Sequence, residues 1–326
     1  MATLSDYLDP TVGALRRQYR ELKTRLPAPP GKRQVPFVPA ETLLCLAASF
    51  VVDHSRFGST TATRAPEPIQ SLARLFQRPP SSVLAKMANL DGSRSHGATW
   101  DKLAGATLRQ DVSRFSVLYR TLLTAARTEG IGQDALPDFL NLENGGELDL
   151  LGQEELSISI VEAVLDEQLK TWRKQPNDLS REDTERILLQ ATRVGQHRFA
   201  SEVLANCGHR CVFCGFAPPS FGASRMLLAS HIKPWRDSSP RERLDKRNGL
   251  AACPTHDVAF DTGLLTVNGE LRIHRSSRLV RGVADDPVAR LYFAQPPLRR
   301  TLLLPEGAEQ PLQQYLHWHQ YRIYTA

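Results

Sequence analysis

Four residues with metal-binding side chains fall into two short pairs. Cys211 and Cys214 form a C-x2-C pair, and Cys253 and His256 form a C-x2-H pair, with 38 residues between the pairs. Zinc prefers tetrahedral thiolate and imidazole ligands, and a two-residue gap lets both members of a pair bind one ion from a tight turn. Gly215 suits such a turn. The spacing predicts a structural Zn²⁺ site; the alternative is two unrelated pairs of buried cysteines and a surface histidine.

Further side chains able to do chemistry lie between and after these pairs. His231 stands in "ASHIKPW" and Asn248 in "RNGL", while Asp257 and Asp261 follow His256 within one short stretch. Residues i and i+4 share a helix face, so the two aspartates are expected side by side. Two carboxylates suit a hard cation such as Mg²⁺ or Mn²⁺. An imidazole that is neutral near pH 7 can accept a proton from water.

The segment "LLASHIKPWRDSSPRERLDKRNGLAAC", with the two pairs, resembles the HNH nucleases, which have the ββα-metal fold. The resemblance covers roughly residues 190–320. It implies an endodeoxyribonuclease that hydrolyses phosphodiester bonds with one metal ion. His231 matches the general base, Asn248 the asparagine that orients the base through its loop, and Asp257 the third residue. Asp257 and Asp261 would then hold the catalytic Mg²⁺ or Mn²⁺.

The chain also departs from that family. Many members have an acidic residue or a histidine directly before the base, as another metal ligand, and this chain has Ser230. Lys233, Arg236 and Arg247 are expected to hold phosphates that flank the scissile bond. Three further segments resemble parts of related bacterial proteins: "RVGQHRF" (193–199), "DTGLLTV" (261–267) and a closing helix at 311–324.

The residues before the site predict a mostly helical domain. Apolar spacing predicts helices at 11–26 and 39–54, and a helix, tight turn and helix over 67–90. This last pattern is typical of a helix-turn-helix, although a plain helical hairpin is as common. It would present Lys86 outward, with Arg94 and His96 in the adjoining loop as further contacts to double-stranded DNA.

Charge and composition agree with a nucleic-acid partner. The net charge is +6, and residues 1–128 carry 18 Lys/Arg against 9 Asp/Glu, whereas 134–167 carry ten acidic residues and no basic one. The chain has five cysteines and no run of 18 apolar residues, which favours a reduced cytoplasmic protein and excludes a membrane span. We expect an α+β fold with a DNA-reading domain (1–130), an acidic connector with a helix (131–180) and a nuclease domain (181–326).

The segment "RPPSSVLAKMANLDGSRSHG" has a faint resemblance to modification-dependent restriction endonucleases of the McrA type. It implies that the N-terminal domain recognises DNA containing 5-methylcytosine. One HNH site cuts one strand, so double-strand cleavage would favour a homodimer. Two alternatives remain: a nuclease indifferent to modification, such as a toxin or phage-associated enzyme, and a non-catalytic zinc and helix-turn-helix regulator.

Overall fold

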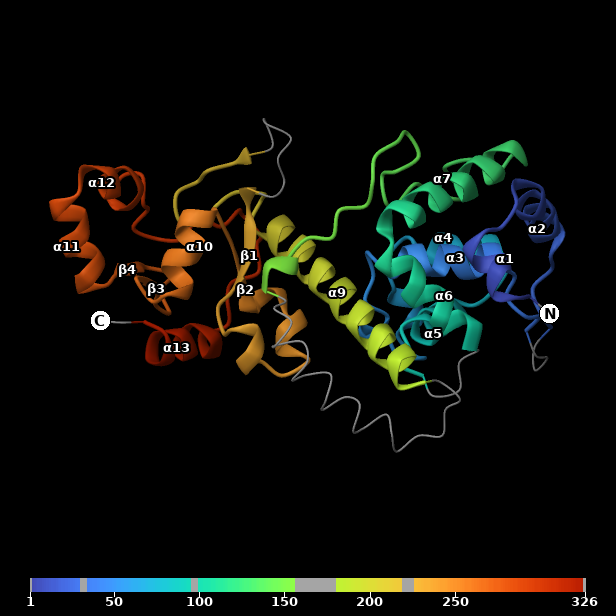
Figure 1. Ribbon diagram of the computed structural model, residues 1–326, viewed down its shortest axis with the longest axis horizontal. Helices are drawn as coiled ribbons and strands as arrows, with labels where there is room; N and C mark the ends of the chain where they lie inside the picture. The colour runs from blue at the N-terminus through green and yellow to red at the C-terminus, as the bar shows by residue number, and fades with distance from the viewer. Residues whose placement is uncertain (1, 30–33, 95–98, 156–179, 219–225, 325–326) are drawn as a thin grey trace. The chain divides into compact units, whose positions relative to one another are not determined.

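The computed structural model describes residues 2–29, 34–94, 99–155, 180–218 and 226–324, and divides the chain into two compact units (Figure 1). The first comprises Met1–Leu150 and Ser157–Gly195, and the second Leu151–Leu156 and Gln196–Ala326. Ile131, Leu136 and Leu140, which follow residue 130, are buried in the core of the first unit. The helix expected at about 155–174 lies largely outside the described residues.

The first unit is helical, and its central helix is buried. The helices described in it are α1 (Leu4–Leu8), α2 (Val12–Thr24), α3 (Pro39–Ala48), α4 (Ile69–Phe76), α5 (Pro80–Leu90), α6 (Thr99–Gln110) and α7 (Val112–Thr128), with 3₁₀ turns η1 (His54–Arg56) and η2 (Ala62–Arg64). Every residue of α3 is buried. Its small and aliphatic side chains let neighbouring helices pack around it, and Pro39 suits its first turn. The helix predicted to residue 54 ends at Ala48.

Several basic residues of the first unit neutralise buried acids. Glu41 of α3 is fully buried, and Arg25 and Arg78 contact its Oε1 at 2.5 and 2.9 Å. Lys86 of α5 contacts Asp101 at 2.5 Å. A buried carboxylate needs such partners because desolvation of an isolated charge is costly. Part of the N-terminal surplus of basic residues therefore stabilises the core.

The predicted helix, tight turn and helix over 67–90 are confirmed as α4 and α5. The turn uses Gln77 in the left-handed region (φ 54°), and Pro80 begins α5. The outward position expected for Lys86 is wrong, since its side chain is only 11% exposed and is paired with Asp101. The pattern of apolar residues located the helix correctly, but it did not show that α6 covers this face with an acid.

The second unit combines two hairpins with helices, in agreement with the α+β expectation. Its elements are the last part of α9 (Arg181–Asn206), β1 (Leu228–His231), β2 (Gly249–Ala252), α10 (Pro254–Asp261), β3 (Leu265–Val267), β4 (Ile273–Arg275), α11 (Ser277–Asp285), α12 (Pro287–Phe293) and α13 (Gln313–Arg322). Strands β1 and β2 pair antiparallel, with His231 opposite Gly249, and α10 packs against both (Figure 1). This is a ββα arrangement. Strands β3 and β4 form a second antiparallel pair.

The ββα hairpin packs tightly on the last turns of α9. A Cβ atom at Gly249 would lie 2.4 Å from Val203 Cγ2 and 2.8 Å from Phe199 Cζ. Any other residue at position 249 would push the strand away from the helix. Among the helices of the described residues, none has the length and apolar character needed to span a membrane.

Candidate metal and catalytic site

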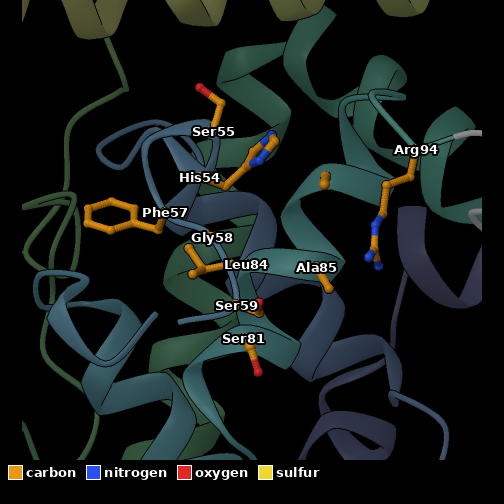
Figure 2. Close-up of a pocket in the computed structure, with 10 residues that line it drawn as sticks. His54, Ser55, Phe57, Gly58, Ser59, Ser81, Leu84, Ala85 and Arg94 are labelled. Atoms are coloured by element: carbon orange, nitrogen blue, oxygen red, sulfur yellow. The ribbon is translucent and has the colours of Figure 1, made fainter. Parts of the chain in front are cut away.

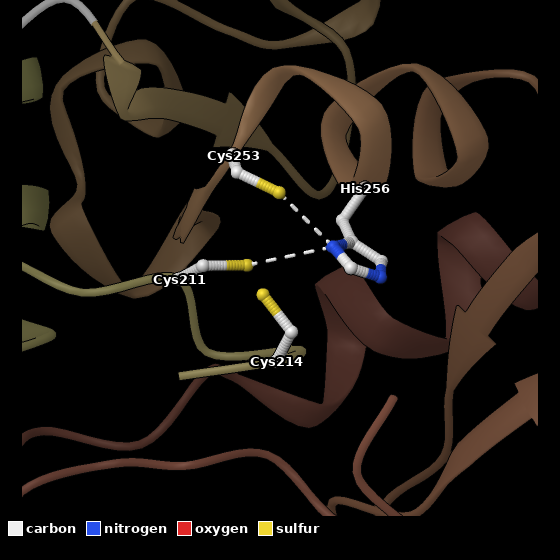
Figure 3. Close-up of side chains that lie close together, drawn as sticks. All are labelled: Cys211, Cys214, Cys253 and His256. Carbon is white, nitrogen blue, oxygen red and sulfur yellow. Dashed lines mark hydrogen bonds between the residues drawn. The ribbon is translucent and has the colours of Figure 1, made fainter. Parts of the chain in front are cut away.

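The predicted zinc ligands come together in the second unit. The thiols of Cys211, Cys214 and Cys253 and one nitrogen of His256 all lie within 4.8 Å of one another (Figure 3). Cys253 Sγ lies 3.0 Å and Cys211 Sγ 3.8 Å from His256 Nδ1. Ligand atoms that lie about 2.0–2.3 Å from a tetrahedral Zn²⁺ are separated from one another by distances similar to those between these four side chains. These four side chains fit one zinc ion.

Local backbone geometry presents each pair. The amide of Cys211 donates to Phe216 O and the amide of Gly215 donates to Cys211 O, both at 2.8 Å, so residues 211–216 form a tight turn. Gly215 has a φ of +84°, which favours glycine. Cys253 precedes α10, and His256 lies in the first turn of that helix. The tight turn at 211–216 and the N-terminal end of α10 thus supply two possible ligands each.

The surroundings prepare these ligands for a cation. His256 Nε2 donates to Tyr292 O at 3.2 Å, which directs Nδ1 towards the thiols. The pKa of Cys253 lies well below its usual range, because the neighbouring thiols of Cys211 and Cys214 hydrogen-bond to its sulfur. Burial would lower the pKa of His256, but its hydrogen bonds to the thiols of Cys214 and Cys253 outweigh it and raise the pKa to about 9, so a metal ion would displace a proton from Nδ1 on binding. A preformed thiolate is the form that binds zinc.

His231, at the end of β1, is held by a carbonyl and an aromatic ring. The side chain is 4% exposed, and Nε2 donates to Arg243 O at 3.2 Å. This assigns the proton to Nε2 and the basic lone pair to Nδ1. The imidazole lies flat on the ring of Phe199, with centroids 3.9 Å apart and planes 8° apart. Both contacts fix the orientation that a general base needs.

The side chain of Asn248 forms hydrogen bonds within the loop that joins β1 and β2. It is fully buried, and its Oδ1 accepts from the amide of Lys233 at 2.9 Å. Its Nδ2 donates to Lys233 O (3.2 Å), Glu242 O (3.1 Å) and Ser238 Oγ (3.3 Å). Glu242 directly precedes Arg243, whose carbonyl accepts the hydrogen bond from His231. Asn248 therefore positions the acceptor that orients the imidazole.

The two aspartates expected to bind the catalytic cation lie on α10. Asp257 is in its first turn and half-buried, and Asp261 is its last residue and exposed. Ser230 Oγ donates to Asp261 Oδ1 at 3.2 Å. Successive strand residues point to opposite faces, which places Ser230 towards α10 and His231 towards α9. Ser230, which stands where many HNH nucleases have another metal ligand, thus connects Asp261, one of the proposed metal ligands, to β1.

The residues expected to contact DNA have differing surroundings. Lys233 pairs with Glu242 at 2.8 Å, Arg236 with Asp237 at 3.2 Å, and Arg247 with Asp245 at 2.9 Å. The Arg236–Asp237 pair is the most exposed of the three, and because solvent-exposed pairs contribute only about 0–1 kcal/mol, a phosphate can replace its carboxylate. In the first unit, Lys86 is paired and partly buried, and Arg94 is exposed. His96 lies outside the described residues.

Two contributors to this site were not predicted. Phe199 is the last residue of the segment noted for its resemblance to related proteins, but a helical phenylalanine is normally read as core. Arg243 contributes through its backbone, and its guanidinium bonds to Trp235 O at 2.9 Å and stacks on the Trp235 ring. Every residue has a backbone carbonyl, so the type of residue at position 243 could not have predicted this role, and only the tertiary structure shows it.

The four possible metal ligands thus lie in the same unit as the antiparallel hairpin and helix that carry His231, Asn248 and Asp257. Residues 211–268 match the model of a family described as HNH endonuclease. The match includes all four zinc ligands and His231, Asn248, Asp257 and Asp261. It supports a nuclease that acts on DNA. No curated protein is similar enough to the chain to count as a match.

Proposed function

We propose that this protein is a DNA endonuclease that hydrolyses phosphodiester bonds with one catalytic metal ion. One observation carries the proposal: His231, within the segment matched to the HNH endonucleases, is locked by Arg243 O into the tautomer that a general base requires. A regulator that only binds DNA needs none of these groups.

The residues divide the reaction between them. His231 Nδ1 takes a proton from the water that attacks phosphorus, while Nε2 stays bonded to Arg243 O. Asn248 holds the loop that carries this carbonyl. Asp257 and Asp261 would hold Mg²⁺ or Mn²⁺, which when bound neutralises charge growing on the phosphate oxygens. Lys233, Arg236 and Arg247 hold flanking phosphates in exchange for their carboxylate partners. Zn²⁺ at the four-ligand site stabilises the fold.

The finer proposal is a restriction enzyme that recognises 5-methylcytosine in double-stranded DNA through its N-terminal domain and acts as a homodimer. It is supported by the separate N-terminal unit, by the basic surplus of residues 1–128 and by the resemblance of one segment to modification-dependent enzymes. The second candidate is an HNH nuclease that is indifferent to modification, because the catalytic residues would be the same.

Cleavage of matched plasmids tests these proposals. One supercoiled plasmid is prepared without methylation and with 5-methylcytosine, and each is incubated with the protein and Mg²⁺ or Mn²⁺. His231→Ala should abolish cleavage, whereas His317→Ala, an exposed histidine of α13, should not change it. Selective cutting of methylated plasmid supports the restriction role, and equal cutting favours the second candidate. Retention of activity in His231→Ala would refute the mechanism.

A further inference from the structure

A pocket of about 330 Å³ lies in the first unit, and none of its lining residues belongs to the proposed catalytic site. Three segments form it: residues 54–59, the face of α5 that carries Ser81, Leu84, Ala85 and Ala88, and Arg94 in the turn that follows α5 (Figure 2). Its volume is near the lower end of the range of about 300–1,000 Å³ for small-ligand sites. It has room for one small ligand and not for a duplex.

Arg94 gives this pocket an available positive charge. Its side chain is exposed and extends along the same side of α5 as Ala85 (Figure 2). Within the described residues, its guanidinium has neither an ion-pair nor a hydrogen-bond partner, in contrast to Arg78 and Lys86 of the same unit. A planar guanidinium is suited to a phosphate, which it can bind through two parallel hydrogen bonds.

The remaining lining is mostly apolar, with serine hydroxyls and one histidine. Leu84, Ala85 and Ala88 of α5 form an apolar wall, and the two alanines leave space above it. The hydroxyls of Ser59 and Ser81 also line the pocket, and neither is used in a described hydrogen bond. The lining thus offers a flat apolar surface, two hydroxyls and one cation, a combination that matches a base and its phosphate.

A hydrogen bond between His54 and Asp91 holds the segment at residue 54 to the turn that follows α5. His54 Nε2 lies 2.5 Å from Asp91 Oδ2, and Asp91 also accepts from the amide of Ser93. Burial would raise the pKa of Asp91, but the hydrogen bonds from His54 and Ser93 hold it below its usual value. The charged carboxylate therefore keeps residue 54 and the turn leading to Arg94 together. Two of the three walls are fixed relative to each other before a ligand arrives.

We propose that this pocket binds a single nucleotide, with its phosphate at Arg94 and its base against the apolar wall of α5. The choice of a nucleotide rests on the proposed function, since a DNA nuclease must meet that chemistry. The nucleotide can come from two sources, a free nucleoside monophosphate or one residue of a DNA strand. In either case the first unit contacts its ligand here and not through Lys86.

Titration calorimetry on the full-length protein tests the pocket. The probes are the four deoxynucleoside 5′-monophosphates, inorganic phosphate and a duplex oligonucleotide, the last with His231→Ala protein so that it is not cut. Arg94→Ala removes the cation, and Ala85→Phe fills the pocket from an accessible helix position. Arg17→Ala, an exposed arginine of α2 without a described partner, is the matched control.

Arg94→Ala is expected to weaken nucleotide binding about 10- to 100-fold, the effect of losing hydrogen bonds to a charged group. Ala85→Phe should weaken it similarly, and Arg17→Ala should change it less than twofold. The same pattern with the duplex alone would support a strand nucleotide as the source. Equal affinity for inorganic phosphate, or no dependence on Arg94 and Ala85 with any probe, would overturn the proposal. Plasmid cleavage is scored separately, so failure of the pocket and failure of the nuclease mechanism are distinguishable.

Discussion

Replacement of Asn248 by aspartate is the sharpest test of how the catalytic loop is held. The change keeps the size of the side chain and the Oδ1 that accepts from Lys233. It removes the Nδ2 hydrogens and puts a carboxylate oxygen against the carbonyls of Lys233 and Glu242. Asn248 is fully buried, so water cannot readily replace the lost donor. The loop should therefore shift and release the carbonyl of Arg243 from His231.

The magnitude follows from the acceptors left without a donor. Each buried carbonyl that loses its partner costs about 1–3 kcal/mol, which gives about 2–6 kcal/mol for two. A central value of about 4 kcal/mol would reduce the correctly oriented base about 10³-fold, at about 1.4 kcal/mol per factor of ten. A domain with the usual 5–15 kcal/mol of stability would on average remain folded.

Plasmid nicking rate with Mn²⁺, thermal melting and circular dichroism measure this effect. Asn268→Asp is the matched control, because Asn268 uses only its Oδ1, which accepts from Glu270 and Arg272 amides. It should retain wild-type activity. We expect Asn248→Asp to be folded and about 10³-fold slower. If it nicks DNA at the wild-type rate, the assignment of Asn248 as the residue that positions the base is wrong.

Three further predictions concern the second unit. Cys253→Ser should lower the zinc content measured by atomic emission from about one ion per chain and reduce the melting temperature, because three ligands hold the ion less well; unchanged zinc would contradict the site. Burial lowers the pKa of His319 to about 4 from 6.5, so stability present above pH 6.5 should fall by about 3 kcal/mol towards pH 4. His319→Gln should flatten urea-derived stability over that window; an unchanged slope would show that His319 is not buried neutral. Phe199→Leu should lower kcat about tenfold with KM unchanged, since the stacked ring orients His231 without touching DNA; a change in KM alone would argue against this role.

Residue spacing along the chain was enough to predict the four possible metal ligands and the order of the other chemical groups. Cys211, Cys214, Cys253 and His256 were identified by spacing, because a knuckle and a helix start each place two ligands over a few residues. The hairpin and α10 were anticipated from the motifs around His231 and Asn248. Apolar periodicity also located α2, α4 and α5, since each buries a regular face.

The surroundings of these groups depend on contacts between distant parts of the chain. Lys86 was expected outside and is paired with Asp101, a residue 15 positions away on another helix. Phe199 and the carbonyl of Arg243 hold His231 from segments 32 and 12 residues distant in the chain. The pocket at Arg94 combines three segments of the first unit. Local spacing predicts groups that one turn or one helix presents, whereas the partners of a side chain depend on which distant elements pack against it.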